Sequence, residues 1–105
     1  MINDEVREIA KRIQEAIKPE RIYLFGSYAR GEETEQSDYD FYVIVDDNAE
    51  NPLTLIDKAY TAIFDMERKP CDILVHKKSR FNERKNGITL ESIIKKEGIV
   101  LYERK

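Results

Sequence analysis

The sequence predicts one α/β (α+β) domain in which helices pack on a small mixed β-sheet. Two observations predict this class: apolar residues recur in blocks of helical spacing, and these blocks alternate with short runs rich in aromatic and β-branched residues. The length of 105 residues, with 41% hydrophobic residues, is enough for one buried core and too short for two. Residues 1–105 are therefore expected to form a single domain.

The first element expected is an amphipathic helix that ends before Pro19. Either Asn3 or Asp4 can cap its start, because both side chains accept hydrogen bonds from free backbone N–H groups. The apolar stripe of this helix consists of Ile2, Val6, Ile9, Ala10, Ile13 and Ile17.

Four short apolar runs are typical of β-strands. The second of them, DFYVIV, has only apolar and aromatic residues after its first position, as expected of a strand that is buried on both faces. The expected strands cover residues 21–25, 40–45, 71–76 and 99–103.

Two longer helical segments are expected between the later strands. The pair Asn51–Pro52 provides a cap and a first helical residue, and this helix should stop near Glu67. Ser79 is expected to cap the next segment, which is interrupted around residues 86–87 and ends at Gly98. A single helical turn over residues 28–31 is also expected, before a polar loop.

Composition excludes several classes of protein. Acidic and basic residues are interspersed and the net charge is −3, which disfavours nucleic-acid binding. No signal peptide or apolar run of membrane-spanning length is present, so we expect a cytoplasmic protein without membrane contact. The single cysteine, Cys71, cannot form an internal disulfide, and a buried structural role is favoured over a nucleophilic one because the only histidine, His76, belongs to the same expected strand.

Two aspartates, Asp38 and Asp40, lie one residue apart where the strand over residues 40–45 begins. Side chains alternate along a strand, so both are expected on one side, where unit charges about 4 Å apart repel by about 4 kcal/mol at an effective dielectric near 20. Asp72 opens the next strand and adds a third carboxylate if the two strands are neighbours. Such oxygen ligands suit Mg²⁺ or Mn²⁺. The alternative is that the aspartates merely cap the strand and its loop.

A Gly26-Ser27 pair precedes these aspartates by ten residues. A residue without a Cβ lets a phosphate approach the backbone, and the Ser27 hydroxyl adds a donor, although Gly-Ser is also a common turn. The combination with Asp38, Asp40 and Asp72 is more specific than any of its parts. Two ions about 3.5 to 4 Å apart at such carboxylates can activate an attacking oxygen and stabilise leaving pyrophosphate.

The stretch GSYARGEETEQSDYD resembles the signature of the minimal nucleotidyltransferases (MNT) of the DNA polymerase β-type superfamily. That signature is Gly-Ser, ten residues and Asp-x-Asp, commonly with Ala-Arg-Gly after the serine, here residues 29–31, and a serine before the first aspartate, here Ser37. The run CDILV resembles the strand that supplies the third carboxylate, and KKEGIVLYE resembles the usual C-terminal ending. The similarity covers residues 18–103 and implies the minimal nucleotidyltransferase fold.

The resemblance also implies an activity and a site. The activity is transfer of a nucleoside monophosphate from an NTP, AMP from ATP being the expected case, with loss of pyrophosphate. By position, Gly26 and Ser27 hold the triphosphate, Asp38 and Asp40 bind two Mg²⁺ ions, and Asp72 completes the metal-binding triad. A further arginine, Arg30, either steadies phosphate or forms a structural salt bridge.

Family members of this length resemble the antitoxin of HEPN/MNT toxin–antitoxin pairs, which adds AMP to a tyrosine of a small helical partner. The short chain leaves no residues for an acceptor pocket, so we expect the acceptor on another molecule. Two alternatives stay open: a non-catalytic antitoxin that neutralises its partner by occlusion, and transfer to a small molecule such as an aminoglycoside, for which a homo-oligomer would supply the missing wall. Near the site, Tyr28 and Tyr39 either stack on a base or pack in the core.

Overall fold

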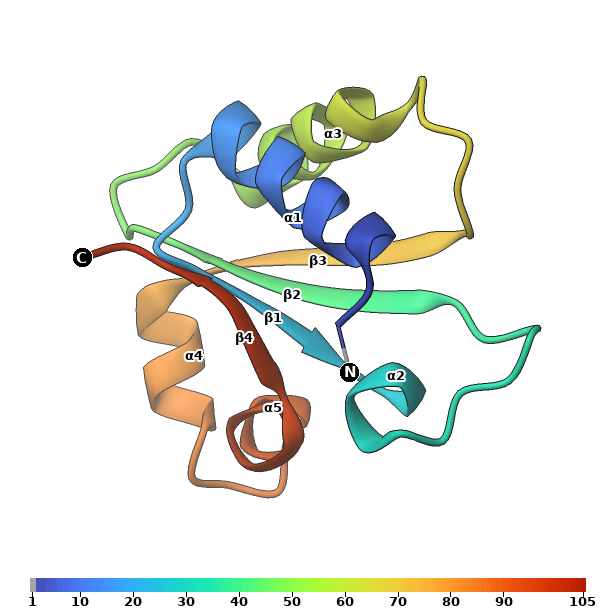
Figure 1. Ribbon diagram of the computed structural model, residues 1–105. Coiled ribbons are helices and arrows are strands. Elements are labelled where there is room, and N and C mark those ends of the chain that lie inside the picture. Colours follow the sequence, from blue (N-terminus) through green and yellow to red (C-terminus); the bar gives the residue numbers. More distant parts are fainter. Residues whose placement is uncertain (1) are drawn as a thin grey trace.

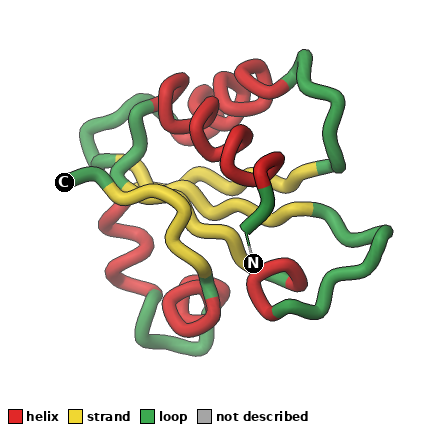
Figure 2. The backbone as a smooth tube through the Cα atoms, viewed as in Figure 1, coloured by secondary structure: helices red, strands yellow, loops and turns green. Residues whose placement is uncertain are grey.

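The computed structural model describes residues 2–105 and shows a four-stranded sheet with helices on both faces, as Figures 1 and 2 show. The strand order is β3-β2-β1-β4. β1 is antiparallel to β2 and to β4, whereas β2 and β3 are parallel, so the predicted mixed sheet is confirmed. The elements are α1 (Asp4–Ile17), β1 (Arg21–Phe25), α2 (Ser27–Arg30), β2 (Tyr39–Val45), α3 (Pro52–Ile63), β3 (Cys71–Lys77), α4 (Lys78–Arg84), α5 (Leu90–Glu97) and β4 (Ile99–Glu103).

The strand β2 runs through the middle of the core and separates two apolar layers. Alternate residues such as Phe41 and Val43 pack with α1 and α3, and the residues between them, Tyr42 and Ile44, pack with α4 and α5 on the opposite face. Every residue of β2 except Asp40 is buried. The prediction of a strand buried on both faces is confirmed, with one polar position at its beginning.

Side-chain caps fix the beginnings of three helices. The Asn3 Oδ1 accepts a hydrogen bond from the N–H of Val6 at 2.8 Å, so of the two candidates Asn3 caps α1. The Asn51 Oδ1 accepts from the N–H of Leu53 at 2.9 Å and Pro52 is the first residue of α3, as predicted. Thr89 caps α5, which ends before Gly98.

Two predicted boundaries are wrong. The helix α4 begins at Lys78, directly after β3, and no side chain within residues 2–105 caps it. Ser79 lies inside the helix and its N–H donates to Asp47 at 2.9 Å. The helix α3 ends at Ile63 and not near Glu67, because tight turns replace the helical bonds after it. No helix within residues 2–105 is long and apolar enough to cross a membrane.

Candidate active site

Two of the predicted carboxylates lie side by side on neighbouring strands. In the parallel register of β2 and β3, Asp40 is the direct partner of Asp72. Paired residues of adjacent strands point to the same face of a sheet, here the face that also carries α4 and α5. The expectation that the second and third strands are adjacent is therefore confirmed.

The third carboxylate, Asp38, lies one residue before β2 begins and is exposed, as is Asp72, whereas Asp40 is half-buried. Burial raises the pKa of Asp40 above its ordinary value, and the charges of Asp72 and Asp38 raise it further. The charge of Arg30 acts in the opposite direction. The negative charges of Asp38 and Asp72 thus both make ionisation of Asp40 harder.

These carboxylates are chemically suited to a divalent cation. Within residues 2–105, the side chains of Asp38, Asp40 and Asp72 have no protein hydrogen bond or ion pair to offset their charges. In the same described part of the chain, no three potential ligands already converge on one metal position. The side chains of Asp38, Asp40 and Asp72 therefore do not meet at one metal position in this structure.

Gly26 lies beside the site, directly after β1. It links β1 to α2 with φ of +76°, and a Cβ built on it would overlap the Asp40 Oδ2. Its neighbour in β1, Phe25, is the register partner of Asp40, which explains this proximity. The absence of a side chain at Gly26 therefore lets the Asp40 carboxylate pack directly against the backbone of this turn, and Ser27 begins the helical turn that follows.

Arg30 forms ion pairs with two carboxylates, one in the loop after α2 and one on α5. Its Nε lies 2.8 Å from Glu32, and its Nη1 lies 3.8 Å from Glu97 of α5. This pairing favours the structural alternative for Arg30. The positive charge of Arg30 nevertheless acts on the site, because it partly offsets the rise in the pKa of Asp40.

Tyr39 and Cys71 have structural environments. The Tyr39 ring is 2% exposed, and its hydroxyl donates to Glu5 at 2.7 Å and accepts from Asn3 at 3.2 Å, so Tyr39 packs in the core. The half-buried Tyr28 lies against it with the ring centroids 4.7 Å apart. Burial raises the pKa of the Cys71 thiol to about 11, which agrees with a structural role.

One important residue was not predicted from the sequence. Glu91 of α5 is 2% exposed; it accepts a hydrogen bond from the Tyr42 hydroxyl at 2.7 Å and another from the Arg84 Nε at 3.0 Å. Tyr42 lies two residues after Asp40 on the same face of β2, so Glu91 joins α4 and α5 to the strand that carries the site. No sequence pattern indicates this contact, because 49 residues separate Glu91 from Tyr42.

Comparison with known proteins agrees with this geometry. The profile of the family described as "Polymerase beta, Nucleotidyltransferase" matches residues 7–105. A protein of Methanocaldococcus jannaschii that carries the provisional name protein adenylyltransferase MJ1379 is 47% identical over 47 residues, which are 45% of this chain. The match spans about half, 47%, of that relative's length.

Solved structures share the fold over almost the whole chain. A toxin–antitoxin crystal structure with AMP-PNP superposes with a TM-score of 0.63 and 25% identity, over 98% of this chain and 76% of that one. A nucleotidyltransferase structure from Sulfolobus solfataricus has a TM-score of 0.58 and 19% identity, over 93% of this chain and 77% of that one, and supports the fold alone. With the family profile covering residues 7–105, the chain belongs to the polymerase beta nucleotidyltransferase family.

Proposed function

We propose that this protein transfers AMP from ATP to a tyrosine hydroxyl of a helical partner protein. The observation that carries the proposal is the direct pairing of Asp40 with Asp72, with the Asp40 carboxylate packed against the backbone of Gly26. That arrangement offers one position for a triphosphate and an adjacent acidic surface for an acceptor. The adenylyltransferase name of the Methanocaldococcus jannaschii relative supports AMP as the transferred group.

In this proposal Gly26 and Ser27 receive the triphosphate. The missing side chain lets a phosphate approach the backbone at Gly26, and the first N–H groups of the following turn have no acceptor inside it. The Ser27 hydroxyl has no hydrogen-bond partner among residues 2–105 and is available as a further donor. We assign Arg30 a supporting electrostatic role, since its guanidinium is already paired with Glu32 and Glu97.

Asp38, Asp40 and Asp72 would hold two Mg²⁺ ions, or Mn²⁺, in this proposal. When bound, the ions neutralise the charges of the carboxylates and triphosphate and stabilise the leaving pyrophosphate. The exposed position of Asp72, on the edge strand β3, suits the acceptor side of the reaction. The tyrosine oxygen forms a bond to the α-phosphorus, the bond from that phosphorus to the bridging oxygen breaks, and the phenolic proton passes to Asp72.

The acceptor is proposed to be a toxin of which this chain is the antitoxin. Two structural neighbours at 25% and 26% identity are toxin–antitoxin proteins, and both superpose over at least 98% of this chain. We assign the reaction to the cytoplasm, in keeping with a single unpaired cysteine.

The test uses the purified protein with its genomic neighbour as the acceptor, ATP and Mg²⁺. Intact mass spectrometry should show the partner heavier by one AMP, and tandem spectra should place AMP on a tyrosine. Asp40→Asn should abolish the transfer, whereas Asp57→Asn, an exposed acid on α3, should not. A partner that remains unmodified while the wild-type protein binds ATP would contradict the proposed reaction.

A further inference from the structure

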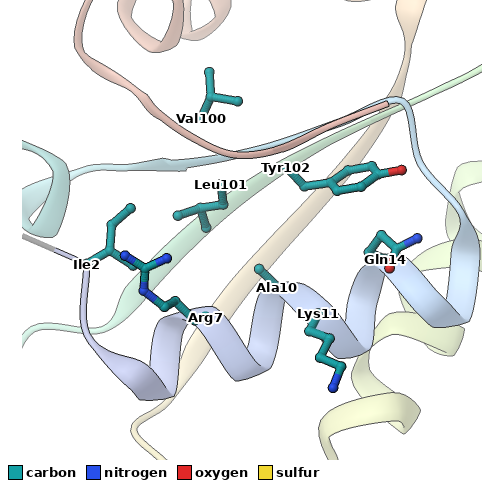
Figure 3. A pocket seen from close by; sticks show the side chains of 8 residues that line it. All are labelled: Ile2, Arg7, Ala10, Lys11, Gln14, Val100, Leu101 and Tyr102. Carbon is teal, nitrogen blue, oxygen red and sulfur yellow. The ribbon is translucent and has the colours of Figure 1, made fainter. Parts of the chain in front are cut away.

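A groove of about 330 Å³ lies between α1 and the edge strand β4, separate from the candidate active site. Figure 3 shows Ala10 of α1 below Leu101 of β4, with Arg7 near Ile2 at one end and Gln14 near Tyr102 at the other. The strand order places β4 at the opposite edge of the sheet from β3 and Asp72. A molecule bound in this groove would leave the carboxylates accessible.

A β-bulge shapes the apolar wall of the groove. Ile22 of β1 pairs with Tyr102 and the next residue, Tyr23, pairs with Val100, so Leu101 has no partner in the ladder. Both Leu101 and Tyr102 pack against the core layer of α1 and α3 as half-buried side chains. Bulges re-aim side chains in this way, and here two consecutive residues face α1.

Two basic side chains on the helical side of the groove have no ion-pair partner within residues 2–105. Arg7 and Lys11 are one helical turn apart, and within residues 2–105 neither makes a side-chain hydrogen bond or an ion pair. Like charges at this spacing disfavour the helix. By contrast, Arg12 on another side of α1 is paired with both Glu8 and Asp65. A negatively charged ligand in the groove could therefore pair with Arg7 and Lys11.

We propose that this groove docks an acidic amphipathic helix of a partner protein. Apolar side chains of that helix would cover Ala10, Leu101 and Tyr102, and carboxylates one turn apart would face Arg7 and Lys11. A helix is favoured over an added strand because the bulge at Leu101 interrupts the edge of β4 on which a strand would have to pair. This inference concerns binding alone and does not depend on AMP transfer.

The probe is a synthetic peptide of about four helical turns, with leucines on one face and glutamates one turn apart beside them. The control peptide has lysines in place of the glutamates. In two-dimensional NMR spectra of the ¹⁵N-labelled protein, the acidic peptide should shift amide signals of α1 and β4, including Ala10 and Leu101. Fluorescence anisotropy should show that Arg7→Glu/Lys11→Glu weakens binding by about tenfold or more.

Two matched variants separate the groove from general charge and from misfolding. Lys85→Glu/Lys96→Glu changes the net charge equally, directly after α4 and on α5, and it should bind the acidic peptide like the wild type. Leu101→Ala keeps all charges and should weaken binding through loss of apolar contact, with an unchanged circular dichroism spectrum.

Four results would overturn the proposal. These are no binding of the acidic peptide at millimolar concentration, equal binding of the lysine peptide, equal weakening by the Lys85/Lys96 variant, or shifts confined to other elements. Sedimentation without peptide should show a monomer. A dimer that Arg7→Glu dissociates would instead assign the groove to a second copy of this chain.

Discussion

Gly26 and Gly31 both have positive φ angles, but their ψ angles, −154° and +24°, and their surroundings differ. Their φ angles are +76° and +72°. A Cβ at Gly26 would overlap the Asp40 Oδ2, whereas a Cβ at Gly31 would meet no atom within 4 Å. Gly31 therefore serves as a control in which a new side chain does not touch the carboxylates.

We predict that Gly26→Ala weakens binding of ATP in the presence of Mg²⁺ by at least about tenfold. Gly31→Ala should leave binding close to wild type, although its left-handed backbone alone should cost about 1 to 2 kcal/mol of stability. The backbone of Gly26 is in a region that is essentially restricted to glycine, where the cost is about 1 to 3 kcal/mol. Calorimetric titration and urea unfolding measure the two effects. Equal loss of ATP affinity in both variants would show that the packing of Asp40 against Gly26 is not what determines ATP binding.

The thiol of Cys71 should be slow to react with alkylating reagents. Burial raises its pKa to about 11 from an ordinary value of 9.0, and only the thiolate is nucleophilic. At pH 8 the thiolate fraction should be about a hundredfold below that of an ordinary thiol. The measurement compares iodoacetamide modification of the native and the urea-unfolded chain, and similar rates would argue against a structural role for Cys71.

At the scale of elements, Glu91 links α4, α5 and β2 through the hydrogen bonds from Arg84 and Tyr42. Burial alone would raise the pKa of Glu91, but these hydrogen bonds outweigh it and bring the pKa below its ordinary value of 4.5. The unfolded chain therefore takes up the proton more readily than the folded chain. Stability from Glu91 is present above pH 4.5 and is lost as the pH falls through the lower, folded pKa.

We expect Glu91→Gln to be less stable than wild type by about 2 kcal/mol at neutral pH, because the buried Tyr42 hydroxyl and the partly exposed Arg84 guanidinium lose a charged acceptor. This difference should be smaller at a pH well below 4.5, where the wild-type carboxylate also takes up a proton. Glu83→Gln, at an exposed position of α4, serves as the control and should change stability little. Urea unfolding at both pH values checks this, and a pH-independent difference would contradict it.

Elements with local signals could be predicted from the sequence, and elements without them could not. The Asn51–Pro52 pair located the start of α3, and Gly98 located the end of α5, because each residue acts on its own backbone. The start of α4 was misplaced at Ser79 because Lys77, which precedes the helix, offers no capping side chain. Glu91 was missed because its partners come from distant segments of the chain.

At the scale of the whole molecule, strand pairing determines whether the site exists. The motif predicted Asp38, Asp40 and Asp72 as candidates, but their proximity depends on the parallel register of β2 and β3, which unites segments more than 30 residues apart. A slip of one residue in this register would move Asp72 to the opposite face of the sheet. The sequence could thus identify the acidic residues but not the sheet order β3-β2-β1-β4 that brings them together.

The same sheet separates two surfaces along its width. Asp40 and Asp72 lie on β2 and β3, whereas the groove beside Arg7 and Leu101 lies along β4 at the far edge. The nucleotide and a docked helix would therefore occupy different parts of the molecule. We expect Arg7→Glu/Lys11→Glu to bind ATP with unchanged affinity, as calorimetry can check; a large loss of ATP affinity would mean that the two surfaces are coupled.

The most direct test of the account is titration of the protein with ATP, with and without Mg²⁺, by isothermal calorimetry. The wild type and the Asp57→Asn control should bind ATP more tightly when Mg²⁺ is present, because the cation offsets the repulsion among Asp38, Asp40 and Asp72. Asp40→Asn should lose this metal-dependent gain. Equal ATP affinity of the wild type with and without Mg²⁺, or an unchanged gain in Asp40→Asn, would contradict the claim that these carboxylates form a metal-dependent nucleotide site.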